Sequence, residues 1–320
     1  MDRACEIVIL GAAITDLQIY PVSKSVVDVA SYPAEQMVWT VGGDTLNEAT
    51  ILTRLGHRVR MISCIGDDAP GAMILEHCRE NHIDTAFLNR DPTKTTAINV
   101  GLIWKDGERT FLNNRSGSLW TFSPEDVDLS AVSEGKILSF ASIFNNPLLD
   151  GPFLLELFRT AAAREMTICA DMVAPKRGET LEDVREALAL VDYFFPNYEE
   201  AARLTGETGI DAIADALLDL GVKNVLLKIG RQGCLVKNRQ RRLIVPAYPD
   251  ARCVDTTGAG DNFASGFICG LLEGLTLEEC AQLANCAASL AIEAVGATQG
   301  VQSRKQVEAR LADYLQKTNK

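Results

Sequence analysis

The sequence predicts an α/β fold in which a mainly parallel sheet is covered by helices on both faces. From about residue 123 onward, short apolar runs alternate with amphipathic helical runs, and repeated strand–helix units of this kind build parallel sheets. Two extended regions, residues 13–44 and 95–117, depart from this alternation. We interpret them as a small β-sheet inserted in one domain of residues 1–320, where it forms a lid over the carboxyl ends of the main strands, the usual ligand side.

The first part of the chain opens on a buried strand and then becomes irregular. Ile7-Val8-Ile9-Leu10 is a continuous apolar run that ends at Gly11, as expected for a strand covered on both faces. Gly42-Gly43 interrupts the chain before a helix. The further elements expected here are extended runs at 17–22 and 37–41, helix 44–55, strand 59–65 and a helix that ends near His82.

A β-hairpin is predicted between residues 95 and 113. Apolar and polar residues alternate up to Trp104, and Asp106-Gly107 separates this run from a second extended run at 109–112. An Asp-Gly pair between two such runs favours a tight hairpin turn.

The rest of the chain is predicted to alternate between helix and strand. Ser123-Pro124-Glu125 is a favourable helix start. The strands are expected at 137–141, 167–171, 193–196, 225–229, 234–237 and 243–246, and the helices at 149–164, 181–190, 198–204 and 210–220.

Composition narrows the function classes. The 320 residues carry a net charge of −12, which argues against binding to nucleic acid or to an anionic membrane surface. The nine cysteines are scattered and include no Cys-x-x-Cys pair, so we expect neither a zinc site nor a disulfide framework. The N-terminal residues lack the pattern of a signal peptide, and a cytoplasmic location is expected.

The segment from Cys253 to Phe267 is the strongest candidate for a functional site. Gly258-Ala259-Gly260 leads into an amphipathic helix, so free backbone N–H groups and the positive end of the helix dipole face one point, which suits an anion. Asp261 follows directly, where it either caps the helix or accepts a proton from a group that attacks a phosphate. Taken alone, such a turn is more often structural, and it is neither a Walker A loop nor a dinucleotide fingerprint.

Four motifs together resemble those of the ribokinase-like (PfkB) carbohydrate kinases, in the same order. Residues 255–263 resemble the C-terminal signature of that family, and Gly42-Gly43 with Asn47 resembles its Gly-Gly-x-x-x-Asn motif. Residues 196–200 resemble its Asn-x-x-Glu motif, and residues 228–233 its nucleotide-side glycine turn. The resemblance implies a three-layer α/β/α kinase domain that uses ATP and Mg²⁺ to phosphorylate a hydroxyl, expected to be primary, of a sugar or sugar acid.

The resemblance also implies roles for the matching residues. Asp261 would be the general base, and the amides of Gly258, Ala259 and Gly260 would form the anion hole. Glu200 would hold the water shell of Mg²⁺ with support from Asn197. The same spacing favours a helix cap, with Asn197 at the N-cap position, and both interpretations can hold at once.

The nucleotide side and the substrate side have further candidates. Lys228, Gly230 and Gly233 would contact the nucleotide, while Asn285 would lie near the adenine or, about equally, serve helix packing. Asp16, Gly43 and Asn47 would bind the sugar, although this chain lacks the family's usual Asn two residues before the acid.

Arg115 suggests an acidic substrate. A lone Arg is usually solvated, but residues 115–118 resemble the Arg-x-Gly-Ser segment of 2-keto-3-deoxygluconate kinases, in which the Arg faces the substrate carboxylate. Lys176-Arg177, which follow Asp171, lie where those kinases carry another basic residue, with different spacing. Arginine suits a planar carboxylate, so a sugar acid is the leading substrate class.

Three further expectations follow from the resemblance. Asp255 and Thr257, with residues 295–300, match the position where many family members bind a monovalent cation, which points to K⁺. The lid is expected to form a homodimer with a second lid and to bury Ile98, Val100 or Trp104. The alternatives are a nucleoside or sugar-phosphate kinase of the same fold and a sugar-binding regulator without activity. None of the three histidines is assigned a catalytic role.

Overall fold

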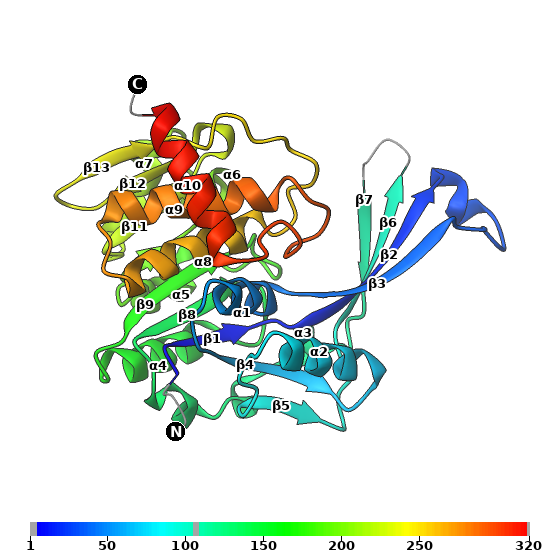
Figure 1. Ribbon diagram of the computed structural model, residues 1–320. Coiled ribbons are helices and arrows are strands. Elements are labelled where there is room, and N and C mark those ends of the chain that lie inside the picture. Colours follow the sequence, from blue (N-terminus) through cyan, green and yellow to red (C-terminus); the bar gives the residue numbers. More distant parts are fainter. Residues whose placement is uncertain (1–4, 105–108, 319–320) are drawn as a thin grey trace.

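The computed structural model describes residues 5–104 and 109–318 and contains a nine-stranded and a four-stranded sheet (Figure 1). The larger sheet has the order β13-β12-β11-β10-β9-β8-β1-β4-β5. Every neighbouring pair from β11 to β5 is parallel, and β12 and β13 add an antiparallel edge. The strands are β1 (Ile7–Gly11), β4 (Val59–Gly66), β5 (Leu88–Asp91), β8 (Ile137–Ile143), β9 (Thr167–Met172), β10 (Tyr193–Phe194), β11 (Asn224–Lys228), β12 (Cys234–Lys237) and β13 (Arg242–Val245).

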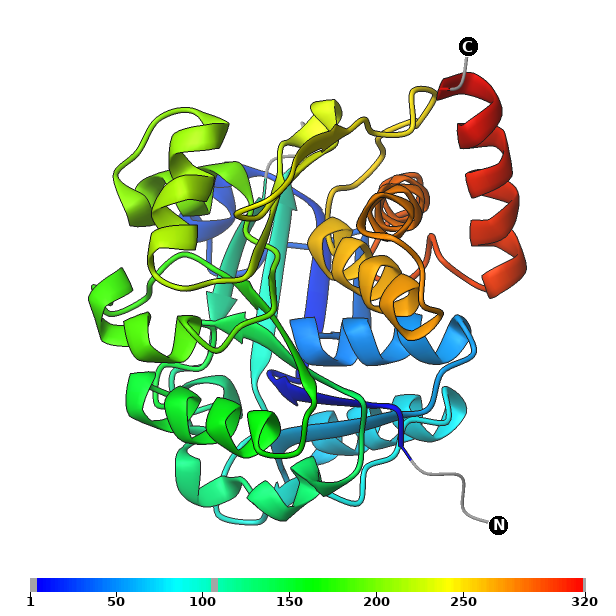
Figure 2. The same cartoon turned by 90° about the vertical axis from the view of Figure 1, so that its left-hand side faces the viewer.

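Helices cover both faces of this sheet, which confirms the predicted three-layer α/β/α class (Figures 1 and 2). Successive residues of a strand point to opposite faces, so Ile7 and Ile9 join one apolar core while Val8 and Leu10 join the other. The first core is covered by α1 (Asp44–Arg54), α2 (Ala69–Glu80), α8 (Ala259–Leu272), α9 (Leu277–Ala291) and α10 (Arg304–Thr318). The second is covered by α4 (Gly151–Ala162), α5 (Leu181–Leu188), α6 (Tyr198–Thr205) and α7 (Ile210–Asp219).

The smaller sheet, called the second sheet below, projects from the main body (Figure 1). Its order is β3 (Gln36–Gly42), β2 (Ile14–Val22), β6 (Ile98–Trp104) and β7 (Arg109–Asn113). β6 and β7 are antiparallel, with Ile103 opposite Arg109. The Asp106-Gly107 turn predicted between them lies outside the described residues.

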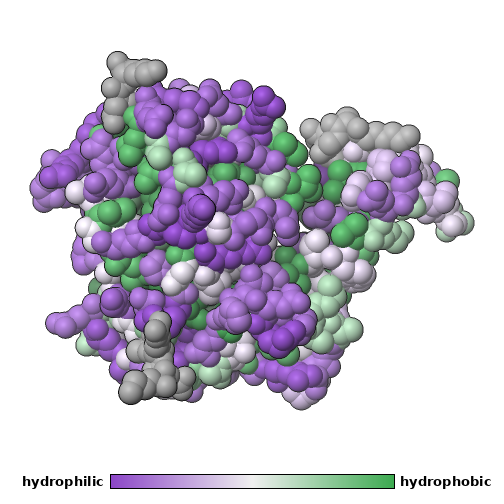
Figure 3. Space-filling view, in the orientation of Figure 1, coloured by the Kyte–Doolittle hydropathy of each residue, from purple (hydrophilic) through white to green (hydrophobic). Residues whose placement is uncertain are grey.

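The two faces of the second sheet differ and are called its apolar and its polar face after the rows given next, although Val38 and Phe111 also lie on the polar face. Residues opposite each other on paired strands share a face, and one such row consists of Trp39, Leu17, Val100 and Leu112. The adjacent row, on the other face, consists of Thr40, Asp16, Asn99 and Asn113. Trp39 is 47% and Leu112 57% exposed, and pale and green residues line part of the projecting sheet (Figure 3).

Two segments differ from the prediction. The helix expected from Ser123 is replaced by two short 3₁₀ turns, η2 (Pro124–Asp126) and η3 (Leu129–Ser133). Here Asp128 accepts a hydrogen bond from the Ser130 amide at 2.9 Å and starts a new turn, so side chain–backbone bonds replace the helical ladder. The edge strand β5 was not predicted, because its sequence Leu-Asn-Arg-Asp contains a single apolar residue.

The short elements that remain are η1 (Lys24–Asp28), α3 (Ser118–Thr121) and η4 (Gly230–Gln232). Within residues 5–104 and 109–318, no helix has the length and apolar character that crossing a membrane requires.

Candidate active site

Charged side chains gather where the carboxyl ends of the central strands meet the N-termini of α1 and α8. Asp171 lies near the end of β9 and Lys228 at the end of β11, while Asp44 begins α1 and Asp261 lies in the first turn of α8. The Lys228 ammonium donates to Asp171 Oδ2 at 2.5 Å. Ser142, near the end of β8, donates to Asp44 Oδ2 at 2.7 Å. The parallel sheet thus brings together residues that are far apart in sequence.

Asp261 is buried and bonded to the sugar-side motif. Its Oδ2 accepts a hydrogen bond from Asn47 Nδ2 at 2.7 Å, and among the described residues it takes none from the amides of its own helix terminus. Burial and the nearby Asp44 carboxylate raise the pKa of Asp261 well above its usual value, against the opposing effect of the Asn47 hydrogen bond. Asn47 Oδ1 is buried without a partner in the described chain. This geometry favours a proton acceptor over a helix cap.

The glycine turn before Asp261 is held rigidly. Gly258 has a φ of +73°, and a Cβ there would lie 2.6 Å from Ala297 Cα, so only glycine fits. The buried Asn262 donates through Nδ2 to Gly258 O at 2.7 Å and to Ala297 O at 2.8 Å. The Ala259 amide donates to Thr256 O at 3.2 Å, whereas those of Gly258 and Gly260 have no partner among the described residues. The amides of these two glycines therefore remain for an anion, as does that of Asp261.

Lys228 lies beside this turn. A Cβ at Gly260 would be 3.1 Å from Lys228 Nζ. Burial raises the pKa of Asp171, and the Lys228 charge opposes that rise. The ammonium thus adds a positive charge next to the two amides, on the anion side of the cluster.

Asn197 and Glu200 form the helix cap that their spacing allowed, and the metal role of Glu200 stays a prediction. Asn197 is the N-cap of α6 and accepts from the Glu200 amide at 2.8 Å. The Glu200 carboxylate is close enough to the cluster for its pKa to be raised to about 7, first by burial and then by Asp171, while Lys228 lowers it. The cap thereby orients Glu200 toward the same group of charges.

The sugar-side candidates lie at the base of the second sheet. Asp16 is on β2, and a Cβ at Gly42 would be 2.6 Å from its Oδ2. Burial raises the pKa of Asp16 to about 6, and a hydrogen bond from Asn99 works against that rise. Gly43 has a φ of +93° and is the N-cap of α1, which begins at Asp44 and carries Asn47 in its first turn.

Arg115 and Lys176 approach one indole ring. The Arg115 guanidinium carbon lies 5.1 Å and Lys176 Nζ 5.5 Å from the centre of the Trp120 ring. Lys176 Nζ donates to Asn145 Oδ1 at 2.6 Å, and Asn145 Nδ2 donates to Asp44 Oδ2 at 2.9 Å. Within the described residues, neither cation has a carboxylate within ion-pair distance.

The nucleotide-side candidates form a tight turn and a helix contact. Gly230 and Gly233, with φ of +60° and +97°, border η4 between β11 and β12. Asn285, on α9, donates to Val245 O and Pro246 O, both at 3.0 Å, and so supports the chain that follows β13. Those contacts match the helix-packing alternative for Asn285, and a contact with adenine stays a prediction.

Asp255 and Thr257 lie in the loop before α8. Thr257 Oγ1 donates to Asp255 Oδ1 at 2.7 Å, and the Gly296 amide donates to Asp255 Oδ2 at 2.9 Å. Arg109 of β7 also contacts both side chains.

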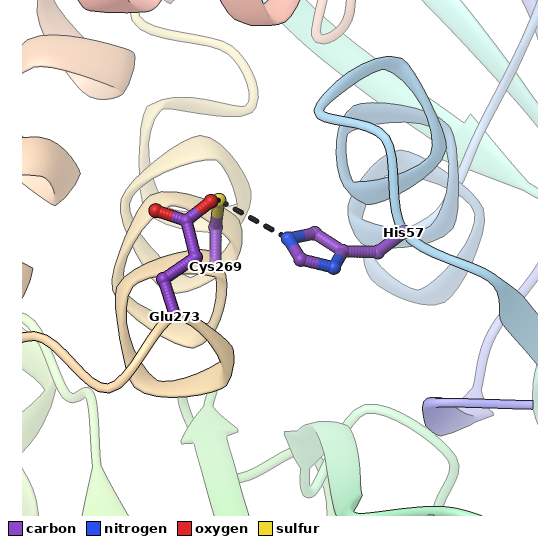
Figure 4. A group of neighbouring side chains, drawn as sticks. All are labelled: His57, Cys269 and Glu273. Carbon is purple, nitrogen blue, oxygen red and sulfur yellow. Dashed lines mark hydrogen bonds between the residues drawn. The ribbon is translucent and has the colours of Figure 1, made fainter.

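A second cluster of ligand-type side chains lies elsewhere, between α1 and α8 (Figure 4). His57 Nε2 is 3.3 Å from Cys269 Sγ, and Glu273 is next to both. Arg304 donates to Cys269 Sγ at 2.8 Å and to Glu273 Oε2 at 2.7 Å. Because a guanidinium already supplies the positive charge, we assign this cluster to the attachment of α10.

Several residues of the site had no predicted role. They are Asp44, Asn99, Asn145 and Asn262. Asp44 and Asn262 stand inside the two strongest motifs, so their positions in the sequence could have indicated them. The polar contacts of Asn99 and Asn145 depend on long-range pairing, which no local pattern reveals.

Comparison with known proteins identifies the family of this chain. The pattern of the pfkB family carbohydrate kinases matches residues 5–304. A 2-dehydro-3-deoxygluconokinase of Haemophilus influenzae is 28% identical over 299 residues, which cover 86% of this chain and 93% of the relative. A 2-dehydro-3-deoxygluconokinase of Bacillus subtilis is 27% identical over 289 residues, 86% of each chain.

Solved structures agree as well. The structure of an Arabidopsis thaliana ribokinase complexed with ribose and ATP superposes with a TM-score of 0.84 at 25% identity, covering 97% of this chain and 99% of that one. A Thermotoga maritima ribokinase also reaches 0.84, at 26% identity, with 96% and 99% covered. The family expected from the four sequence motifs is confirmed: this chain belongs to the pfkB family of carbohydrate kinases.

Proposed function

We propose that this kinase transfers the γ-phosphoryl group of ATP to a hydroxyl of a sugar acid, with Asp261 as the general base. The observation that carries the proposal is the position of Asp261. Its buried carboxylate faces Asn47 on the sugar side and follows the unbonded amides of Gly258 and Gly260. A proton acceptor and an anion site are adjacent there, as phosphoryl transfer to an alcohol requires.

Different residues of the chain would bind the substrate, accept its proton and stabilise the transferred group. Asp16 and the unpartnered Asn47 Oδ1 accept hydrogen bonds from substrate hydroxyls and orient the attacking oxygen. Asp261 takes the proton of that hydroxyl, and its raised pKa makes it a stronger base than an exposed aspartate. The amides of Gly258 and Gly260, with the Lys228 ammonium, stabilise the charge on the transferred group without having to reorganise.

The charge balance of the site fits ATP with Mg²⁺. Four carboxyl groups, those of Asp44, Asp171, Glu200 and Asp261, act on one another's surroundings, and the Lys228 ammonium opposes the rise in the pKa of Asp171, Glu200 and Asp261. Hard divalent cations favour such oxygen-rich surroundings and keep part of their water shell. When bound, Mg²⁺ supplies charge neutralisation for the phosphates. Glu200, oriented by Asn197, would hold its waters, and the Gly230–Gly233 turn would border the nucleotide.

Arg115 and Lys176 support a sugar acid as the substrate. Both cations lie near the same ring, with the Arg115 guanidinium carbon 5.1 Å and Lys176 Nζ 5.5 Å from the centre of the Trp120 ring. Neither is neutralised by a carboxylate of the described chain. A substrate carboxylate would supply the missing charge. The hydrogen bonds from Lys176 through Asn145 to Asp44 place this pair on the side of the site where α1 begins.

The test is an ATP-consumption screen over aldoses, ketoses, aldonates, keto-deoxy acids, nucleosides and sugar phosphates. We expect keto-deoxy acids to give the highest kcat/KM, and Arg115→Ala to raise KM for acids by roughly 10-fold while neutral sugars change little, since paired charge-assisted hydrogen bonds are lost. Arg241→Ala, on an exposed turn, is the matched control. A preference for nucleosides, or no turnover with any acceptor, would contradict the proposal.

The second sheet would act as the lid of this site. Asp16 and Asn99 lie on its polar face, so closure over the substrate would exclude water that competes as a phosphoryl acceptor. Its apolar face, which includes Val100 with Ile98 and Trp104 on the same strand, would be buried by a second copy of the chain in a homodimer. A cytoplasmic location stays a prediction.

A further inference from the structure

Arg109 connects the second sheet to the loop that precedes the anion site. Its Nη1 donates to Asp255 Oδ1 at 3.1 Å and to Thr257 Oγ1 at 3.0 Å, across 146 and 148 residues of sequence. Arg109 is the first residue of β7, whereas Thr257 directly precedes Gly258. One side chain of the projecting sheet thus contacts two side chains of the loop that leads directly into the turn at 258–260.

The donors around Asp255 leave little room for a metal ion. Besides Arg109, Oδ1 accepts from the Thr257 amide at 3.0 Å and from Thr257 Oγ1 at 2.7 Å, and Oδ2 accepts from the Gly296 amide at 2.9 Å. Burial acts to raise the pKa of Asp255, but these hydrogen bonds outweigh it and hold the pKa below its usual value. The carboxylate is therefore charged, accepts four hydrogen bonds, three of them at Oδ1, and is already paired with one cation, so the residues present do not fit a K⁺ ion bound at this carboxylate.

We propose that the Arg109 guanidinium is the cation of this loop and takes the place that a monovalent metal ion would otherwise fill. Arg109 is then a positioning residue: it holds Asp255 and Thr257, and through them the turn at 258–260. The anion site is complete only when the second sheet lies against the main body. The inference rests on the proposed role of residues 258–260 in phosphoryl transfer.

Arg109 is a cation tethered to the chain, whereas K⁺ exchanges with the solution. A K⁺ ion must bind from solution, and the Asp255 carboxylate loses its partner when the ion dissociates. Arg109 instead belongs to β7, a strand that contributes to the polar face of the second sheet. Its Nη1 bonds one oxygen of Asp255 and one of Thr257, and the planar guanidinium fixes the direction of these bonds, which a spherical ion does not. The Arg109 side chain is 38% and that of Asp255 13% exposed, so the pair is partly screened by solvent and the effect is moderate.

The test compares kinetics with and without monovalent metal ions. Initial rates are measured with ATP, Mg²⁺ and the best acceptor while KCl replaces tetramethylammonium chloride at constant ionic strength. We expect the wild type to change by less than about 2-fold, and Arg109→Ala to lose roughly 3- to 10-fold in kcat without added K⁺, as for a partly exposed ion pair. K⁺ should restore part of that loss, and Arg109→Lys, which retains the charge, should lose less.

Lys24→Ala is the matched control, because it removes one exposed positive charge from the segment between β2 and β3. It should behave like the wild type in both salts. Strong activation of the wild type by K⁺, or an Arg109→Ala enzyme that equals the wild type in both salts, would overturn the inference.

A second measurement does not depend on turnover. Thermal unfolding is followed without substrate in KCl and in tetramethylammonium chloride. A vacated site should bind K⁺, so K⁺ should raise the Tm of Arg109→Ala but not that of the wild type. If the screen finds no acceptor, the proposed function fails, yet this comparison still decides the role of Arg109; equal responses of the two proteins to K⁺ would contradict it.

Discussion

Replacing Asp16 by asparagine should make the protein more stable at neutral pH while it impairs the reaction. Burial raises the pKa of Asp16 from its usual value of 3.8 to about 6. The folded state therefore holds the Asp16 proton more tightly than the unfolded state does, and the free energy of unfolding falls as pH rises through this interval. Above pH 6 the charged carboxylate costs stability, and Asp16→Asn removes that cost.

The size of the effect follows from the pKa difference. The rise in the pKa of Asp16 corresponds to about 3 kcal/mol, and the partial exposure of this side chain lowers the figure to about 1–3 kcal/mol. For a chain of this length, with an unfolding entropy of about 2 cal/mol/K per residue, the Tm should rise by roughly 2–4 °C.

The assay is urea or thermal unfolding of both proteins from pH 4 to pH 8, together with kcat/KM at pH 7.5. The stability difference should be near zero at pH 4, grow up to about pH 6 and stay constant above it. Asp28→Asn, on the exposed η1 turn, is the control and should show no such pH dependence. A variant that is less stable than the wild type at every pH, or equally active, would refute the reasoning.

Three further predictions concern residues of the same site. Asp261→Asn should retain the fold and should still bind ATP, which calorimetry measures, while turnover falls roughly 10²–10⁴-fold, the range for a general base. Near-normal turnover would contradict the assignment of Asp261 as the base. Glu200→Gln should raise the Mg²⁺ concentration needed for half-maximal rate by roughly 10-fold, as for other groups that act through a metal's outer shell, and an unchanged Mg²⁺ titration would remove Glu200 from that role. Gly258→Ala should lower the free energy of unfolding by about 1–3 kcal/mol beyond Gly274→Ala, because both glycines have a φ of +73° but only a Cβ at 258 meets another chain segment, 2.6 Å from Ala297. Equal urea midpoints for the two glycine variants would contradict that clash.

The regular elements of the main sheet were predictable because their patterns are local. The all-apolar run at β1 and the helix stop at Gly56 depend only on residues near in sequence. β5 escaped prediction because an edge strand need not be apolar, and its parallel pairing with β4 supplies what its own sequence lacks. The helix predicted from Ser123 was wrong for the opposite reason. The start of the segment is helix-like, but side chain–backbone hydrogen bonds further along form 3₁₀ turns in place of a helix.

The sequence by itself determined the fold class, the carbohydrate kinase family and the candidates for base and anion site, because glycine spacing and an adjacent acid are local necessities of a phosphate-binding turn. Tertiary structure alone decided how those candidates are paired. It placed Asn47 on Asp261, Lys228 on Asp171 and Arg109 on Asp255, in each case across more than 50 residues. Such pairs carry no local pattern, since a buried charge or a strand from a second sheet finds its partner only when the chain has folded.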